Sequence, residues 1–144
     1  MVKVLFICHG NICRSPLAEY ILKDLVKKAG RSEDFHIISR AVSMEEYLNS
    51  VYPPARRLLD SHGISCQGHH ARMVTEQELA EFDHIYYMDS RNRQYLQRLF
   101  PAYAHKCQPL LDRDVADPYY YGGFDQTWED IFTGCSRIVK ELIG

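Results

Sequence analysis

Apolar residues follow two different spacings in the first part of the chain. Val2 to Ile7 is almost wholly aliphatic and β-branched, which is typical of a strand that is buried on both faces. From Pro16 onward, apolar residues recur at every third or fourth position until Gly30, and this spacing predicts an amphipathic helix. Phe35 to Ser39 then has the character of a second short strand. A strand, a helix and a strand in this order indicate a parallel sheet.

Further elements alternate in the same way along the middle of the chain. Thr75 and Glu78 match a capping box, which marks the start of a helix. Residues 40–54 lack a clear period, so we expect a long surface loop there. We expect the remaining elements to be helices over 54–62, after Thr75 and from Asp89, and strands over 84–88 and 107–111.

The final segment repeats apolar residues at helical spacing between residues 128 and 142. We expect a closing helix whose apolar side chains, Phe132 and Cys135 among them, lie in the core. No linker, repeat or low-complexity tract divides the chain, so residues 1–144 are expected to form one domain. The pattern predicts an α/β fold, with a doubly wound sheet of about four parallel strands and helices on both faces.

Composition narrows the class of protein without naming a function. Seventeen basic and nineteen acidic residues give a net charge of -2, which does not favour binding to nucleic acid or to an anionic membrane. The chain shows no signal-peptide pattern and no run of about 18 apolar residues, so we expect a cytoplasmic protein without a membrane span. The five cysteines form no C-x2-C pair, which argues against a zinc site or a disulfide framework.

A cysteine and an arginine lie at the two ends of a short loop after the first strand. Cys8 ends the apolar run, and Arg14 follows six positions later, just before the helix that Ser15 and Pro16 begin. Unpaired backbone N–H groups and the positive end of the helix dipole meet at such a place, so an anion is stabilised there. A cysteine at a helix amino end beside an arginine ionises readily, and we expect Cys8 to be a thiolate.

A thiolate and a guanidinium in one loop point to phosphoryl chemistry. Cys8 would attack phosphorus, and the planar fork of Arg14 matches two phosphoryl oxygens. The Ser15 hydroxyl is close enough in sequence to donate to the Cys8 sulfur, while Gly10 and Asn11 suit the unusual backbone angles of such a loop. The C-x5-R spacing alone leaves a second interpretation open, in which Cys8 is a small buried apolar residue at a strand end.

The full string C-H-G-N-I-C-R-S-P, residues 8–16, resembles the signature of the low-molecular-weight protein tyrosine phosphatases. The resemblance implies a flavodoxin-like, phosphotyrosine phosphatase I-like fold. It also implies hydrolysis of phosphotyrosine through a phosphocysteine, without a metal or a cofactor, in a loop that cradles the phosphoryl group. The loop residues with this binding role would be His9, Gly10, Asn11, Ile12, Cys13 and Ser15.

A proton donor is needed because the departing tyrosine is a phenolate, whose conjugate acid has a pKa of about 10. Asp117, in the segment D-P-Y-Y, matches the general acid of the family, although aspartate before proline is also a common turn former. Residues 117–123 are expected to form a rigid, exposed turn. Tyr119 and Tyr120 resemble the tyrosine pair that flanks the family's cleft, while the additional Tyr121 leaves the assignment of that pair open.

Two further segments resemble supporting parts of the family's site. Residues 69–72 match an H-x-A-R segment, by which His69 would hydrogen-bond to Asn11 in the loop and Arg72 would be structural. Adjacent histidines are otherwise usually surface residues. Asp89 matches an M-D-x-x-N pattern and is expected to cap the next helix or to brace the loop.

The stretch after the second strand forms one wall of the substrate cleft in the family. Tyr47 is the candidate aromatic residue for this wall, and an ordinary half-buried loop tyrosine is the alternative. Ser39 is expected to support the loop. Arg40 and Ala41, which follow it, depart from the family's usual Ser-Ala-Gly pattern, so substrate preference is left open by this region.

Two alternatives from other functional classes remain. An arsenate reductase on the same scaffold would need a relay of further cysteines, and none lies between Cys66 and Cys107. A non-catalytic phosphate-binding module would not need Cys8, Arg14 and Asp117 together. Within the phosphatases, Ile12 resembles the branch that acts on phosphotyrosine, whereas the branch that acts on phosphoarginine tends to carry threonine there.

The resemblance also implies partners and regulation. The expected partners are phosphotyrosine-containing proteins, a tyrosine kinase among them, and the expected state is a monomer or a weak homodimer. Cys13 lies five residues from Cys8 in a loop that bends back on itself. In the family such a pair forms a reversible disulfide that protects the nucleophile from over-oxidation, and the alternative is that Cys13 only packs beneath the loop.

Overall fold

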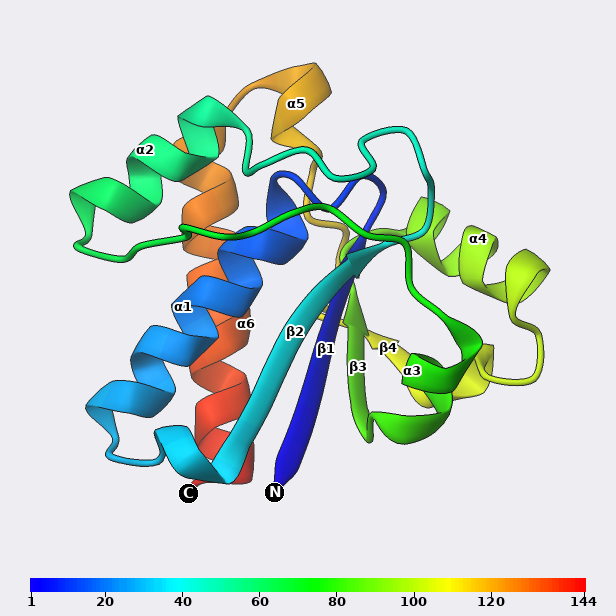
Figure 1. Cartoon of the computed structure of the whole chain (residues 1–144), viewed down its shortest axis with the longest axis horizontal. Coiled ribbons are helices and arrows are strands. Elements are labelled where there is room, and N and C mark those ends of the chain that lie inside the picture. The colour runs from blue at the N-terminus through cyan, green and yellow to red at the C-terminus, as the bar shows by residue number, and fades with distance from the viewer.

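The computed structural model describes residues 1–144 as one parallel four-stranded sheet with helices on both faces (Figure 1). The strand order is β2-β1-β3-β4, so β1 is central and pairs with β2 on one side and β3 on the other. The strands are β1 Val2–Cys8, β2 Phe35–Ala41, β3 His84–Tyr87 and β4 Cys107–Pro109. The α-helices are α1 Arg14–Lys28, α2 Pro53–Ser61, α3 Glu76–Glu81, α4 Ser90–Leu99, α5 Pro118–Tyr121 and α6 Phe124–Leu142.

Strand β1 separates two apolar cores because its side chains alternate between the two faces of the sheet. Val4 and Phe6 belong to the larger core, which α1, α2 and α6 cover. Leu5 and Ile7 belong to the smaller core, which is closed by residues of α3 and α4. This explains why the strand is apolar at nearly every position.

All four strands run in the same direction, so their carboxyl ends meet at one edge of the sheet. The loop from β1 to α1, the loop after β2 and the segment with α5 gather at this edge, and both chain termini lie at the opposite one (Figure 1). In open α/β sheets, ligands bind at this carboxyl edge. No helix combines the length and the apolar character that a membrane crossing requires.

The predicted fold class is confirmed, and so are the expected helices and strands, with ends that move by up to four residues. The capping box of Thr75 and Glu78 is present at the start of α3. Asp89 and Asn92 form a second one at the start of α4.

Three local expectations are wrong. The surface loop expected over 40–54 is shorter, because Arg40 and Ala41 complete β2 and Val51 is buried against the larger core. The turn expected over 117–123 contains the short helix α5. Phe132 is 42% exposed rather than buried. Neighbouring residues lie about 100° apart around a helix, and the buried face of α6 is centred near Ile131, so Phe132 lies on its flank.

Candidate active site

The Cys8 sulfur takes the place of a cap at the amino end of α1. Strand β1 ends at Cys8, and the helix begins six residues later without any side-chain cap. The Cys8 sulfur accepts hydrogen bonds from the backbone N–H groups of Asn11 at 3.3 Å and Ser15 at 3.4 Å. A thiolate at this position is stabilised by these dipoles, because they are fixed before any ligand arrives.

Asn11 holds the sharp bend of the loop formed by residues 8–15, which we call the cysteine loop. Its φ of 61° lies in the left-handed region, where asparagine is the best tolerated residue after glycine. Its side chain is fully buried, and its Oδ1 accepts a hydrogen bond from the backbone N–H of Arg72 at 3.2 Å. This contact fixes the orientation of the amide, because a backbone N–H can only donate.

The orientation of Asn11 sets the direction of a chain of hydrogen bonds. Its Nδ2 donates to the Ser15 hydroxyl at 2.8 Å and to the Ser39 hydroxyl at 2.9 Å. Since both hydroxyl oxygens accept from Asn11, their own protons are free to be donated onward. Ser39 donates to the buried Glu19 carboxylate at 2.6 Å, and the Ser15 hydroxyl lies 3.0 Å from the Cys8 sulfur. The chain of donors therefore ends on a carboxylate at one side and on the Cys8 sulfur at the other.

His69 makes the contact that its segment predicts. Its Nε2 lies 2.9 Å from the carbonyl oxygen of Asn11, and burial lowers the pKa of the imidazole. A neutral ring that donates from Nε2 satisfies this carbonyl, so His69 adds a further hydrogen bond that holds Asn11 in place. The neighbouring His70 is exposed. Arg72 contributes backbone contacts to Asn11 and to β2, while its side chain is exposed.

Arg14 is a charged side chain that is only 1% exposed, and it is held from three directions. Its Nη1 donates to Asp89 at 2.6 Å and to the carbonyl oxygen of Val115 at 2.8 Å, and its Nη2 donates to Asp117 at 3.2 Å. Burial by itself would lower the pKa of Arg14, but the negative charges of Cys8, Asp89 and Asp117 outweigh it and raise the pKa. The guanidinium therefore stays charged.

These three bonds leave part of the guanidinium for a ligand. Arginine has five N–H groups, and the bonds to Asp89, Val115 and Asp117 use three of them. The two that remain are one on Nε and one on Nη2. Nε and Nη2 together form an edge of the guanidinium that can bind two oxygens of a phosphate or carboxylate in parallel. Asp89 therefore braces the loop as expected, and it also caps α4.

Asp117 is the amino-terminal cap of α5 and reaches the cysteine loop through Arg14. One carboxylate oxygen accepts from the backbone N–H of Tyr119 at 3.1 Å, and the other accepts from Arg14. Asp117 lines the same pocket as Cys8. An acid that came from the far end of the sequence thus lies over the loop that carries the thiol.

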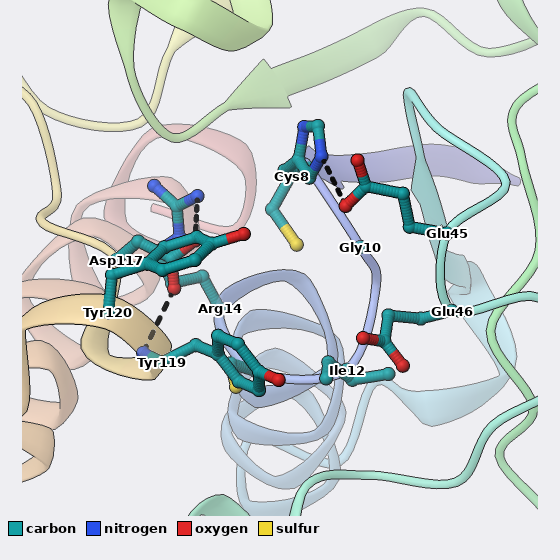
Figure 2. A pocket seen from close by; sticks show the side chains of 11 residues that line it. Cys8, Gly10, Ile12, Arg14, Glu45, Glu46, Asp117, Tyr119 and Tyr120 are labelled. Carbon is teal, nitrogen blue, oxygen red and sulfur yellow. Dashed lines mark hydrogen bonds and ion pairs between the residues drawn. The ribbon is translucent and has the colours of Figure 1, made fainter.

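The pocket has the cysteine loop as its floor and two unlike walls (Figure 2). Asp117, Tyr119 and Tyr120 lie on one side of the opening, and Glu45 and Glu46 lie on the other, with the Cys8 sulfur between them. The remaining lining residues are His9, Gly10, Ile12, Cys13 and Arg14.

Two expectations about this pocket are wrong. Tyr47 does not line it, because the wall from the loop after β2 is made by the preceding residues Glu45 and Glu46. Gly10 has no left-handed φ, which leaves only Asn11 in the left-handed region within the loop. The reason for a glycine here is space, since a Cβ at Gly10 would lie 3.1 Å from Cγ of Glu46.

Two of the three consecutive tyrosines line the pocket. Tyr119 and Tyr120 line it, whereas Tyr121 lies in a neighbouring hollow. Tyr52, which the sequence did not single out, supports the pair, because its ring packs edge-on against Tyr119 with 5.0 Å between centroids. Glu19 was also missed, since a glutamate in an amphipathic helix carries no signal of burial.

Cys13 shares the pocket with Cys8. Burial raises the pKa of its thiol, and the nearby charge of Cys8 raises it further. Among the side chains of the chain, no group of three or more histidine, cysteine or acidic residues is placed to hold a metal ion. The chemistry available in the pocket is that of a sulfur nucleophile, an anion-binding loop and a carboxyl group.

Comparisons with known proteins agree with this description of the pocket. The family model described as "Low molecular weight phosphotyrosine protein phosphatase" matches residues 3–143. The chain is 37% identical to the low molecular weight protein-tyrosine-phosphatase YfkJ of Bacillus subtilis, and the alignment covers 99% of this chain and 96% of that protein.

Solved structures show the same fold over the whole chain. The crystal structure of YfkJ from Bacillus subtilis superposes with a TM-score of 0.95 at 36% identity, covering 99% of this chain and 95% of that one. The crystal structure of DARP, a drosophila arginine phosphatase, superposes with a TM-score of 0.89 at 31% identity and covers 99% of both chains.

Proposed function

The chain belongs to the low molecular weight phosphotyrosine protein phosphatase family, and from this premise we propose that it hydrolyses phosphotyrosine without a metal, through a phosphocysteine on Cys8. It is a cysteine-dependent protein tyrosine phosphatase by its relatives and its fold. One observation supports the assignment of roles above all. The Cys8 sulfur lies among fixed donors, in the pocket that Arg14 and Asp117 also line.

In the first step the phosphoryl group enters the cysteine loop and the Cys8 thiolate attacks phosphorus. The S–P bond forms while the bond from phosphorus to the tyrosine oxygen breaks, and backbone N–H groups with the free edge of Arg14 stabilise the charge on the phosphoryl oxygens. Asp117 donates its proton to the leaving phenolate oxygen.

In the second step water attacks the phosphocysteine. Asp117, now a carboxylate, accepts a proton from this water as the P–S bond breaks, and phosphate leaves. The Ser15 hydroxyl, oriented toward the sulfur by Asn11, stabilises the thiolate as it departs. The loop is thereby returned to its starting state.

The shape of the pocket supports an aryl phosphate as substrate. Tyr119 and Tyr120 offer apolar rings on one wall, and Ile12 lines the floor between the walls. Ile12 resembles the phosphotyrosine branch of the family rather than the phosphoarginine branch. The proposed protein substrates carry phosphotyrosine, and a tyrosine kinase is one such protein. The family and the relatives favour hydrolysis over arsenate reduction.

We propose that the enzyme acts in the cytoplasm and that its activity is regulated there by reversible oxidation. The thiols of Cys8 and Cys13, which line one pocket, support this proposal. Peroxide would oxidise the Cys8 thiolate to a sulfenic acid, and the Cys13 thiol would attack this sulfur and release water to form a disulfide. Thiol treatment should then restore wild type, while Cys13→Ser should lose activity irreversibly. Equal recovery of both proteins would contradict the mechanism.

The roles are tested by hydrolysis of a series of aryl phosphates whose leaving groups differ in acidity, with a chelator present. We expect no effect of the chelator and no turnover by Cys8→Ser. Asp117→Asn should lose about 100-fold or more on phosphotyrosine, and the loss should shrink as the leaving group becomes more acidic. Phosphoarginine serves as the competing substrate and should be the poorer one.

Two variants control for the loss of a thiol or a charge elsewhere. Cys107→Ser removes a half-buried thiol on β4, and Asp112→Asn removes an exposed carboxylate five residues before Asp117. Both should retain wild-type rates. Turnover by Cys8→Ser, or an Asp117→Asn loss that is the same for every leaving group, would contradict the assigned roles.

A further inference from the structure

We infer that Glu45 and Glu46 make this enzyme select phosphotyrosines that have a lysine or arginine beside them in the substrate. The inference rests on the proposed function, because it concerns the residues that flank the phosphotyrosine when its phosphoryl group is in the cysteine loop. It assigns a specificity role to a wall that the sequence had assigned to Tyr47.

Both glutamates are held at the opening of the pocket. Glu46 packs against the cysteine loop so closely that a Cβ on Gly10 would lie 3.1 Å from its Cγ, and its carboxylate accepts from the side chain of Asn49. The Glu45 carboxylate lies 3.0 Å from Nε2 of His9, next to the nucleophile in the chain. Contacts with the loop itself therefore set the position of this wall.

The floor and the opening of the pocket carry opposite charge. The positive charge of Arg14 lies on the floor, where it is buried and bonded to Asp89 and Asp117. Glu45 and Glu46 are at the opening, and no lysine or second arginine lines this pocket. A phosphoryl group is small enough to reach the floor, whereas the neighbouring residues of a protein substrate stay at the level of the glutamates.

The opposite wall suits the same flanking residue. Tyr120 is 62% exposed and Tyr119 is 45% exposed at the opening, and aromatic ring faces attract lysine and arginine side chains. Partial burial raises the pKa of Tyr120, and the charges of Glu45 and Asp117 raise it further, as expected for a hydroxyl in a negative field.

One cation nearby acts in the other direction without reversing the balance. Arg91 lowers the pKa of Tyr120 and lines the hollow on the far side of Asp117. The carboxylates of Asp89 and Asp114 line the same hollow, so acidic side chains outnumber basic ones there too. The field around the phosphotyrosine therefore favours a cationic neighbour on either side.

The test uses phosphotyrosine peptides that differ at one flanking position, with lysine, glutamine or glutamate, and compares their kcat/KM values. Wild type should prefer the lysine peptide to the glutamate peptide, by about two- to fivefold for each exposed charge pair. The preference should fall between 0.1 M and 1 M salt, since the screening length drops from about 10 Å to about 3 Å.

Variants assign the preference to the wall. The double variant Glu45→Gln with Glu46→Gln should bring the three peptides to within twofold of one another, and Glu46→Lys should reverse their order. Glu33→Gln is the matched control, because it removes the same charge from the exposed 3-10 turn Ser32–Asp34 before β2, at the opposite edge of the sheet. It should keep the wild-type order.

The outcomes separate this inference from the proposed function. If wild type hydrolyses a simple aryl phosphate but treats the three peptides alike, the inference is overturned and the function stands. A lysine preference that persists in the double variant also overturns it, because the selectivity would then lie elsewhere. If aryl phosphates are not hydrolysed at all, the proposed function fails first.

Discussion

The floor and the opening of the pocket are built in different ways. The sulfur and guanidinium of the floor are almost wholly buried, and each is bonded to several partners. Glu45, Tyr119 and Tyr120 at the opening are exposed, and their contacts are few. The floor is therefore fixed before a substrate arrives, whereas the opening is an edge of the surface that can change without loss of the fold.

This difference assigns chemistry to the floor and selection to the opening. Hydrogen bonds that are already formed cost no reorganisation during the reaction, so they stabilise a transition state effectively. Exposed charges and rings are screened by water and contribute little individually. Substitutions on the floor should thus change the rate by orders of magnitude, and those at the opening should change the choice of substrate by small factors.

Apart from the loss of the nucleophile itself, the largest effect is expected from Arg14→Lys. An ammonium cannot bond Asp89 and Val115 while it also offers two parallel N–H groups to a phosphoryl group. We expect kcat to fall by about 100- to 1000-fold with the folded structure kept, as measured by steady-state kinetics and circular dichroism.

Arg113→Lys gives the matched comparison for Arg14. Arg113 forms a bidentate pair with Asp130 on α6 and does not line the pocket, and its side chain is exposed where that of Arg14 is buried. The same substitution there should lower stability slightly and leave kcat unchanged. A comparable fall in kcat for Arg113→Lys would mean that the Arg14 effect is one of folding.

The floor was predictable from sequence because its parts are adjacent in the chain. A buried strand, a thiol, a bend and a helix start follow one another within residues 2–16, so local rules place them together. The sheet was predictable for the same reason, since each strand carries its own apolar run. The contacts of Arg14 with Asp89 and Val115 join distant segments, and only the family pattern pointed to Asp89.

Tyr119 and Tyr120 at the opening were indicated by the D-P-Y-Y segment, but the opposite wall was not predicted, because nothing in its local sequence fixes it. Residues 42–52 have no hydrophobic periodicity, so the sequence does not show which of their side chains face the pocket. In the structure Glu45 and Glu46 line it instead of Tyr47. The predicted burial of Phe132 was wrong for a similar reason. Helical spacing shows that a face is apolar, but only packing shows where the buried face ends.

Asn11 should give the second largest effect, mainly on stability. Asn11→Gly keeps the left-handed bend but leaves Ser15, Ser39 and the N–H of Arg72 without their partner, which should cost about 2–4 kcal/mol. Asn11→Ala should cost about 1 kcal/mol more, because alanine is strained at this φ. Chemical denaturation measures both values. If alanine and glycine cost the same, the bend is not strained.

His69, which supports the cysteine loop through Asn11, should make the free energy of unfolding depend on pH. Burial lowers its pKa in the folded state, so the folded protein binds fewer protons than the unfolded chain, in which the pKa is about 6.5. Its contribution is complete above that pH and is lost as pH falls toward the lowered value. His69→Gln can still donate to Asn11 but does not titrate, so it should flatten the slope of unfolding free energy between pH 7 and 5.

The exposed His105 is the control for this slope. His105→Gln should leave the wild-type dependence of stability on pH in place, because this side chain is exposed on the surface. A slope that is the same in His69→Gln and in wild type would assign the dependence to the carboxylates instead.

The smallest effect is expected at the opening, and its sign is opposite to that of the floor. Glu45→Gln removes a negative charge from the path of a dianionic aryl phosphate, so kcat/KM should rise by about twofold at low salt. The gain should vanish near 1 M salt, because Glu45 is exposed and its field is then screened within about 3 Å. Stopped assays at both salt concentrations measure it. A fall of tenfold or more would show that Glu45 supports catalysis through its contact with His9, and would contradict the assignment of chemistry to the floor and selection to the opening.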